Sequence, residues 1–399
     1  MAAPAPEPVL DVRRFGRTPV GFIVTLASCS LVALIALVIV VRGGPVPALT
    51  GLALALLPVP QVHAAVLYLD RLDPAPRALL AVMFGAGAGV AALTALAGRA
   101  LHTGVITVPE LGPQAGRVAG VTATAAIGGA VVAESLKGAV LLALFGARRH
   151  EIDGVHDGVV YASMTALGFA LIANVYAYAE AERDGFGALA SAFARRGILG
   201  PLWDPLFSSM IGIGIAYAAM RRGGRGYWAI AAGWVAAVAL DALWNGSVAA
   251  GPTRLAVVYL VLAGALAVVA GLVAADRRRI VGLIKRFLPG YAASGAVTEP
   301  DVTMLASMRW RRAGRQWARL HRGHTGLRAM SEYQLAATAL ALAANRDSLG
   351  LIAPEVFAAR RENALGLMRA AVDVLRAGRA PLRSPPWERN GRSVFAKDA

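Results

Sequence analysis

Four ionisable residues interrupt stretches of sequence that are otherwise apolar. Glu134 and Lys137 stand three positions apart within one apolar run. Asp204 lies near the start of another run, and Asp241 lies in the middle of a third. An ionisable side chain in a membrane-spanning helix is costly and usually faces the interior of the helix bundle. Because buried carboxylates can hold a divalent cation or activate a water molecule, these residues predict a polar site inside a bundle.

Most of these residues also have a purely structural interpretation. Glu134 and Lys137 share one helical face at i, i+3 spacing, so an intrahelical ion pair accounts for both. Asp204, within Trp203-Asp204-Pro205, fits the N-cap of the helix that follows. No cap explains Asp241, which is therefore the strongest single indication of a polar interior site.

The composition of the chain requires a lipid environment. Of 399 residues, 57% are hydrophobic and 16% are charged, and the mean hydropathy is +0.57. A water-soluble domain of this composition would expose large apolar patches. The net charge of +16 comes largely from arginines in short connections and in the last third of the chain, which indicates topology and contact with anionic headgroups rather than nucleic acid. The single cysteine, Cys29, permits neither an intrachain disulfide nor a thiolate metal cluster.

We predict an all-α, polytopic bundle of about eight spanning helices, because a helix needs about 20 apolar residues to cross a bilayer. The expected ranges are 19–41, 47–69, 78–98, 119–146, 158–179, 201–220, 227–249 and 254–275. Most arginines then fall in alternate connections, which the positive-inside rule places in the cytoplasm together with both ends of the chain. We expect a multi-pass protein of the plasma membrane.

Helix depth tests whether the polar residues could meet. With a rise of about 1.5 Å per residue, Asp204, Asp241 and Asn174 fall in the outer half of the bilayer. Glu134 falls near the middle. One shared cavity is therefore geometrically possible.

The chain divides into four expected parts. Residues 1–18 form a cytoplasmic segment, 19–276 the transmembrane domain, 277–380 a cytoplasmic amphipathic helical tail, and 381–399 a disordered end. Helices of the tail are expected to begin near Thr298 and Ser331, with another over 354–377. Tryptophans and arginines mix between residues 308 and 322, a composition that suits either an anionic leaflet or a solvated helical face. Glycine-rich stretches at 85–89 and 128–130 predict close helix packing.

A second polar cluster, over residues 150–157, contains two histidines and several acids. Its short spacing fits no standard zinc geometry. We therefore interpret it as an exposed polar turn.

Six short motifs follow one another along the chain. They are Tyr68-Leu69-Asp70-Arg71, Ala133-Glu134-Ser135-Leu136-Lys137, Asp157-Gly158-Val159-Val160-Tyr161, Gly168-Phe169 with Ala173-Asn174, Trp203-Asp204-Pro205, and Asp241-Ala242-Leu243-Trp244-Asn245. Their order resembles the PrsW-type intramembrane metalloproteases over roughly residues 50 to 345, including a tail pattern around Tyr333. The resemblance implies a helical membrane fold that hydrolyses peptide bonds of membrane proteins with a zinc-type ion.

The chain departs from the family pattern at the residues that bind and use the metal. Ala133 and Ala173 stand where the family has glutamates, and Asp204 and Asp241 stand where it has histidines. The two aspartates are the candidate metal ligands. The candidate catalytic residues retained from the family pattern are Glu134, Lys137, Asn174 and Asn245. Since alanine neither binds a metal nor transfers a proton, and aspartates make a harder oxygen site, these replacements argue against zinc hydrolysis of the usual kind.

Three functions follow as hypotheses. The first is a pseudoprotease that binds membrane segments or partner proteins in the former substrate cleft. The second is an enzyme in which Glu134, Asp204 and Asp241 hold another divalent ion or share a proton. The third is a proton- or ion-coupled transporter, which broken helices and an internal repeat would favour; the sequence shows neither. The expected partners are membrane lipids, anionic headgroups at the cytoplasmic face and transmembrane proteins, and no nucleic acid.

Overall fold

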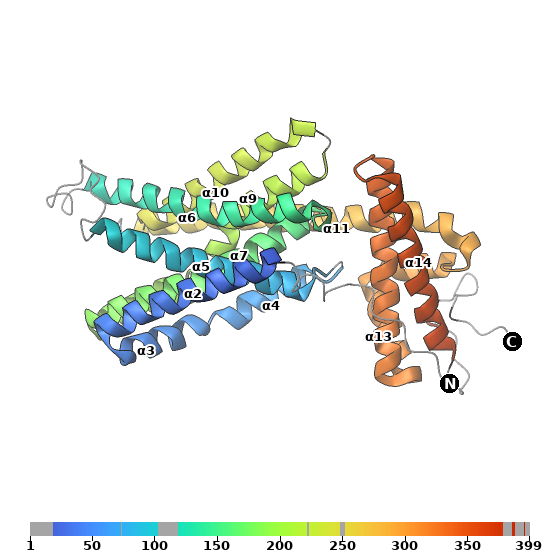
Figure 1. Ribbon diagram of the computed structural model, residues 1–399, viewed down its shortest axis with the longest axis horizontal. Helices are drawn as coiled ribbons and strands as arrows, with labels where there is room; N and C mark the ends of the chain where they lie inside the picture. Colours follow the sequence, from blue (N-terminus) through green and yellow to red (C-terminus); the bar gives the residue numbers. More distant parts are fainter. Residues whose placement is uncertain are drawn as a thin grey trace. The chain divides into compact units, whose positions relative to one another are not determined.

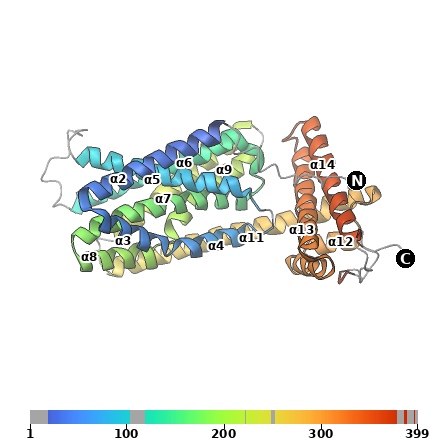
Figure 2. The same ribbon diagram turned by 60° about the horizontal axis from the view of Figure 1, so that its bottom comes forward.

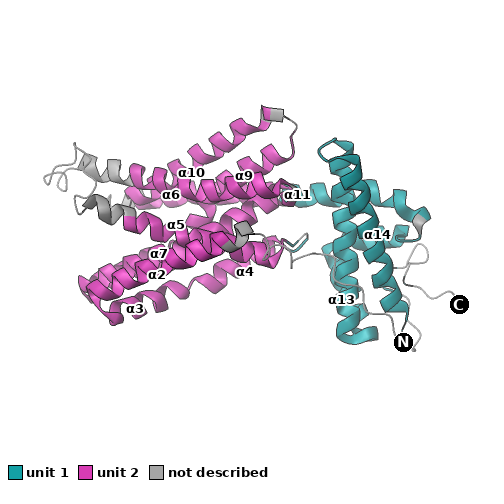
Figure 3. Cartoon of the chain, in the orientation of Figure 1, with its two compact units in different colours: residues 1–11, 71–74, 274–399 teal, residues 12–70, 75–273 magenta. Residues whose placement is uncertain are grey.

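The computed structural model describes residues 19–72, 74–102, 119–221, 223–247, 252–377, 385–387 and 395. These residues are helical, apart from short connections, and no strand occurs among them. The predicted cytoplasmic segment 1–18 lies outside the described residues. Figure 3 colours two compact units: unit 2 comprises residues 12–70 and 75–273, and unit 1 comprises residues 1–11, 71–74 and 274–399.

Unit 2 is a bundle of long apolar helices that run side by side (Figure 1). Among the residues that the structure describes, eight helical segments are long and apolar enough to cross a membrane, which confirms the predicted polytopic all-α fold. The helices that begin in unit 2 are α2 (Pro19–Gly43), α3 (Pro45–Leu56), α4 (Val59–Leu69), α5 (Arg77–His102), α6 (Ala119–Arg148), α7 (Val155–Arg183), α8 (Phe186–Phe193), α9 (Trp203–Ala219), α10 (Tyr227–Ser247) and α11 (Pro252–Phe287).

Two of the spans differ from the predicted helices. The second span is divided into α3 and α4 at Leu57–Pro58, because proline lacks the backbone N–H that a continuous helix would use. The expectation of unbroken spans is therefore wrong at this position. The last span, α11, continues to Phe287 instead of ending near residue 275, since the arginine-rich sequence after the apolar run also favours a helix.

Helix α7 lies at the centre of unit 2 and packs closely on its neighbours through glycines. A Cβ atom on Gly87 of α5 would overlap the backbone oxygen of Thr165 in α7. Gly158 of α7 and Gly212 of α9 each approach the other's backbone oxygen in the same way. Small residues at such contacts let helix backbones approach closely in lipid.

The glycine-rich stretches do not all serve this packing. A Cβ atom on Gly85, Gly128 or Gly129 would have nothing within 4 Å. The prediction of close packing therefore holds for Gly87 and for Gly89, where a Cβ atom would meet Ser28, and is wrong for these three positions. The number of glycines in a stretch does not reveal which of them faces the neighbouring helix.

Unit 1 contains its own helices. They are the 3-10 segment Leu288–Ser294, α12 (Glu299–Leu305), α13 (Met308–Ser348) and α14 (Pro354–Arg376). Figure 2 shows α13 and α14 side by side. Thr298 caps α12 as predicted, since Asp301 Oδ2 accepts hydrogen bonds from the Thr298 backbone N at 3.1 Å and from its hydroxyl at 2.5 Å.

The predicted helix start at Ser331 is wrong. Ser331 lies inside α13, and its hydroxyl donates to the Leu327 carbonyl oxygen at 2.8 Å. The interruption in α13 falls instead at Arg322 and Gly323, where Gly323 has a φ of 58°. That left-handed conformation suits glycine, which has no Cβ atom to clash.

A single apolar core holds unit 1 together. It includes Trp317, Tyr333 and Met368, together with Leu72 from the connection between α4 and α5. Trp317 is 6% exposed and packs in a protein core. For this tryptophan, both interpretations drawn from the sequence, contact with an anionic leaflet and a solvated helical face, are therefore wrong. The sequence predicts disorder for residues 381–399. The structure describes only residues 385–387 and 395 of this range, and among them Trp387 and Phe395 are buried in the core of unit 1.

Candidate functional site

Three helices bring four ionisable side chains together within unit 2. Lys137 and Glu134 come from α6, Asp204 from α9 and Asp241 from α10. The Lys137 Nζ atom lies 2.5 Å from Glu134 Oε1 and 3.5 Å from Asp204 Oδ1. Asp241 is near enough to interact electrostatically with the other three side chains. We call these four residues the charged cluster.

The charged cluster is buried except at Asp204. The Glu134 and Lys137 side chains are 0% exposed, whereas the Asp204 side chain is 29% exposed. The i, i+3 ion pair expected from the sequence is present. The N-cap interpretation of Asp204 is wrong, because Leu202 holds the cap position and Asp204 lies in the first turn of α9.

Further side chains complete the surroundings of the cluster. The Ser208 hydroxyl donates to Glu134 Oε2 at 3.1 Å, and Asn245 Nδ2 donates to Asp241 Oδ1 at 2.7 Å. Lys137 Nζ lies 4.5 Å from the centre of the Phe169 ring, which adds a cation–π contact. Sequence reasoning missed Ser208, and it named Phe169 as part of a motif without predicting a place for it in the site. The i+4 spacing of Ser208 from Asp204 is the signal that places both on one face of α9.

Asn174 lies in a different environment. Its Oδ1 accepts a hydrogen bond from Arg196 Nη1 at 3.4 Å, and Arg196 belongs to the π-helical segment Ala194–Ile198. Phe169, from the same helix, contacts the charged cluster. Asn174 thus has a hydrogen-bond partner that does not belong to the charged cluster.

The charged cluster does not fit a zinc ion. Zinc is bound most often by neutral imidazoles and thiolates, and the cluster offers only carboxylate oxygens. The Lys137 ammonium group already lies against Glu134 and Asp204, so a metal cation there would be repelled or would have to displace it. Within the described ranges, no group of three His, Cys, Asp or Glu side chains has a metal-binding arrangement.

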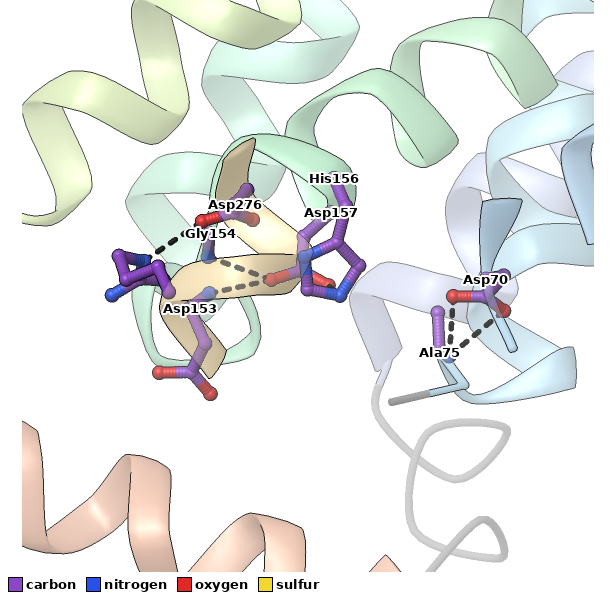
Figure 4. A network of polar contacts seen from close by, with 8 residues as sticks. Asp70, Ala75, Asp153, Gly154, His156, Asp157 and Asp276 are labelled. Atoms are coloured by element: carbon purple, nitrogen blue, oxygen red, sulfur yellow. Dashed lines mark hydrogen bonds and ion pairs between the residues drawn. The ribbon is translucent and has the colours of Figure 1, made fainter. Parts of the chain in front are cut away.

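A second group of polar residues surrounds the start of α7 (Figure 4). Asp157 Oδ2 accepts hydrogen bonds from the backbone N atoms of Asp153 at 2.7 Å and Gly154 at 2.9 Å, which caps the helix. His156 Nε2 lies 3.0 Å from Asp157 Oδ1, and both side chains are buried. The interpretation of this segment as an exposed turn is therefore wrong for these two residues.

Asp70 follows α4 and closes the connection to α5. Both of its carboxylate oxygens accept from the Ala75 backbone N, at 3.1 and 3.0 Å, and the residue is 3% exposed (Figure 4). Burial raises the pKa of the Asp70 carboxyl to about 7, against the opposing effect of the Ala75 hydrogen bond; the negative charge of Asp157 raises it further, and His156 lowers it.

This raised pKa predicts that the protein is less stable at neutral pH than in mild acid. Because the folded pKa of about 7 lies above the ordinary value of 3.8, the folded chain keeps a proton that the unfolded chain releases between these values. The contribution of the Asp70 carboxyl to stability is therefore greatest below pH 4 and falls as the pH rises to 7, by at most about 4 kcal/mol. Asp70→Asn keeps an acceptor for Ala75 and should flatten this fall.

Thermal unfolding of the purified protein in detergent at pH 5 and pH 8 measures the effect. The wild type should melt several degrees higher at pH 5, and Asp70→Asn should lose most of that difference. Asp184→Asn, at an exposed aspartate of unit 2, is the matched control and should keep it. An undiminished difference in Asp70→Asn would show that other groups cause the pH dependence.

The eight apolar helices and their internal charged cluster define a polytopic membrane protein with a polar interior site. A family model described as PrsW family intramembrane metalloprotease matches residues 75–272, which contain α5 to α10 and the whole charged cluster. The chain belongs to this family. The match is shorter than the resemblance over residues 50 to 345, since 50–74 and 273–345 lie outside it. No curated protein and no solved structure matches the chain.

Proposed function

We propose that this chain is a member of the PrsW family without zinc hydrolysis, which binds segments of other membrane proteins within unit 2. The observation that supports this proposal is the position of Lys137. Its ammonium group lies against Glu134 and Asp204, where a catalytic metal would need the same oxygens. The charged cluster therefore already contains its own cation.

The contacts of the Glu134 carboxylate also support the absence of zinc hydrolysis. A general base must reach a water molecule and accept its proton. One oxygen of Glu134 is ion-paired with Lys137, and the other accepts from Ser208. Ala133, directly before it, has no group that could take over the role. Asp204, partly exposed, leaves the cluster an edge at which a polar group of a bound segment can make contact.

The orientation and membrane of the protein belong to the proposal as well. We place the protein in the plasma membrane with both ends in the cytoplasm. The arginine-rich alternate connections support this orientation through the positive-inside rule.

Metal content tests the proposal directly. Purified wild-type protein, equilibrated with zinc and then freed of excess ion, should retain well below one zinc per chain. A variant that carries the family residues, Ala133→Glu, Ala173→Glu, Asp204→His and Asp241→His together, should retain more, because imidazoles and a carboxylate suit zinc. Asp184→His with Asp347→His, a variant with two new histidines away from the cluster, controls for the added ligands.

One result would overturn the proposal. If the wild type holds one zinc per chain and Asp241→Ala releases it, while the control variant does not change it, the cluster is a metal site. Lys137 would then have to move aside when the metal binds.

A further inference from the structure

Unit 1 contains a pocket of about 410 Å³. Its wall combines α13 with the short connection that follows α4. The polar side chains that line it are Arg71, Arg311, Arg312, Arg315, Ser331 and Gln334. We call it the arginine pocket.

The arginine pocket concentrates positive charge. Four of its lining residues are arginines, and no aspartate or glutamate is among the lining residues that the structure describes. Burial lowers the pKa of the Arg315 guanidinium, and the nearby charges of Arg312 and Arg71 lower it further. Guanidinium groups gathered at one place repel each other, and an anion between them would relieve the repulsion.

Hydrogen bonds hold the inner arginines in fixed positions. Arg315 Nη1 donates to Gln334 Oε1 at 2.6 Å, and Gln334 Nε2 donates to the Arg311 carbonyl oxygen at 3.0 Å. Arg311 is 2% exposed, and its Nη2 donates to Thr338 Oγ1 at 2.6 Å. Arg312, by contrast, is exposed. The pocket therefore has a rigid floor and a more mobile arginine at its mouth, because an exposed arginine keeps its rotamer freedom.

The Arg311 side chain also fixes the wall that comes from the connection. Its Nε donates to the Leu305 carbonyl oxygen at 2.8 Å, and its Nη1 donates to the Leu72 carbonyl oxygen at 3.2 Å. Leu72 lies next to Arg71, which lines the pocket. Both sides of the pocket are thus joined through one buried side chain.

The position of the pocket along the chain relates it to the membrane surface. Arg71 comes two residues after Leu69, where the second candidate span ends, and Pro74 comes three residues before Arg77, where the third begins. Residues so close to two span ends lie at the level of lipid headgroups. Arginine binds phosphate oxygens with two parallel hydrogen bonds, which a planar guanidinium supports better than an ammonium group.

We propose that the arginine pocket binds a phosphate group, carried by the headgroup of an anionic phospholipid or by a small soluble phosphate ester. Its volume lies in the range of small-molecule sites. Arg312 and Arg315 are expected to contact the phosphate group, and substitution of both arginines tests these contacts. The proposal does not depend on whether the charged cluster of unit 2 is catalytic.

Lipid binding by the full-length protein tests the proposal. The protein is reconstituted in phosphatidylcholine nanodiscs, and the dissociation constants of two added short-chain lipids, phosphatidic acid and phosphatidylcholine, are compared. The variant Arg312→Gln/Arg315→Gln should bind the phosphatidic acid about tenfold more weakly than the wild type. The matched control is Arg319→Gln/Arg328→Gln, which removes the same charge from exposed positions of α13 outside the pocket and should change binding less than twofold.

A competition experiment identifies the source of the phosphate. If inorganic phosphate or glycerol phosphate displaces the added phosphatidic acid from the wild type, but does not reduce the weaker binding that remains in the pocket variant, a soluble ester is the ligand. If neither competes, the lipid headgroup is the ligand. The proposal is overturned if the pocket variant and the control variant weaken binding equally, or if phosphatidylcholine alone binds as well. Arg312→Gln alone, at an exposed position, replaces the double variant if that one unfolds.

Discussion

Lys137→Met is expected to destabilise unit 2 by about 3 to 5 kcal/mol, the cost of removing one partner from a buried ion pair. Methionine has nearly the length of lysine but no charge. The Glu134 carboxylate, 0% exposed, would keep only the Ser208 hydrogen bond, and Asp204 and Asp241 would lose the cation that they share. The expected readout is a melting temperature in detergent that is lower by roughly 10 °C, since 1 kcal/mol corresponds to about 2 to 4 °C in a domain of this size.

A second substitution separates the charge from the packing. In Glu134→Gln/Lys137→Met the cluster loses one negative and one positive charge together, so no unpaired charge remains at residue 134 and part of the stability should return, although Asp204 and Asp241 still lack their shared cation. Lys285→Met, at an exposed lysine of α11, is the matched control and should leave the melting temperature within about 1 °C. If Lys137→Met melts like the wild type, the ammonium group does not neutralise the cluster, and the proposed function loses its main support.

Gly87→Ala is the second change with a large expected effect. The added methyl group would overlap the Thr165 backbone oxygen, and backbone atoms at a helix contact cannot turn aside as a flexible side chain can. Helices α5 and α7 would have to move apart along their contact. We expect a loss of about 3 kcal/mol, at the upper end of what overpacking usually costs.

Gly85→Ala provides the comparison two residues away in the same helix. A Cβ atom there meets nothing within 4 Å, and alanine is the better helix former by about 1 kcal/mol. The Gly85 variant should melt at or slightly above the wild-type temperature, and the Gly87 variant well below it. Equal melting temperatures for the two variants would mean that α5 does not pack on α7 through Gly87.

The spanning helices could be predicted from the sequence because lipid allows few alternatives. A backbone in hydrocarbon must satisfy its own hydrogen bonds, so a long apolar run becomes a helix almost regardless of its neighbours. The same argument says little about what happens within or beyond a run. It missed the division at Pro58 and the continuation of α11 to Phe287, which depend on local backbone chemistry and not on hydropathy.

The sequence predicted how deep each site residue lies in the membrane, but not how each helix is rotated about its own axis. The rise along each helix placed Glu134, Asp204 and Asp241 at compatible levels, and the structure brings them together. The direction in which each side chain points depends on how its helix is turned against its neighbours. Asn174, also near the right depth, therefore faces Arg196 instead. In unit 1 the partners of Trp317 come from distant parts of the chain, and no local pattern reveals them.

The core of unit 1 is assembled from parts of the chain that leave the ribosome at very different times. Leu72 emerges before most of the spanning helices exist, whereas Trp387 and Phe395, which pack in the same core, are made only after the described spans are complete. Contacts between such distant segments form late and slowly. Insertion of the bundle into the bilayer must therefore precede completion of unit 1, and an interrupted translation product would carry its spans but expose an open core to quality-control proteases.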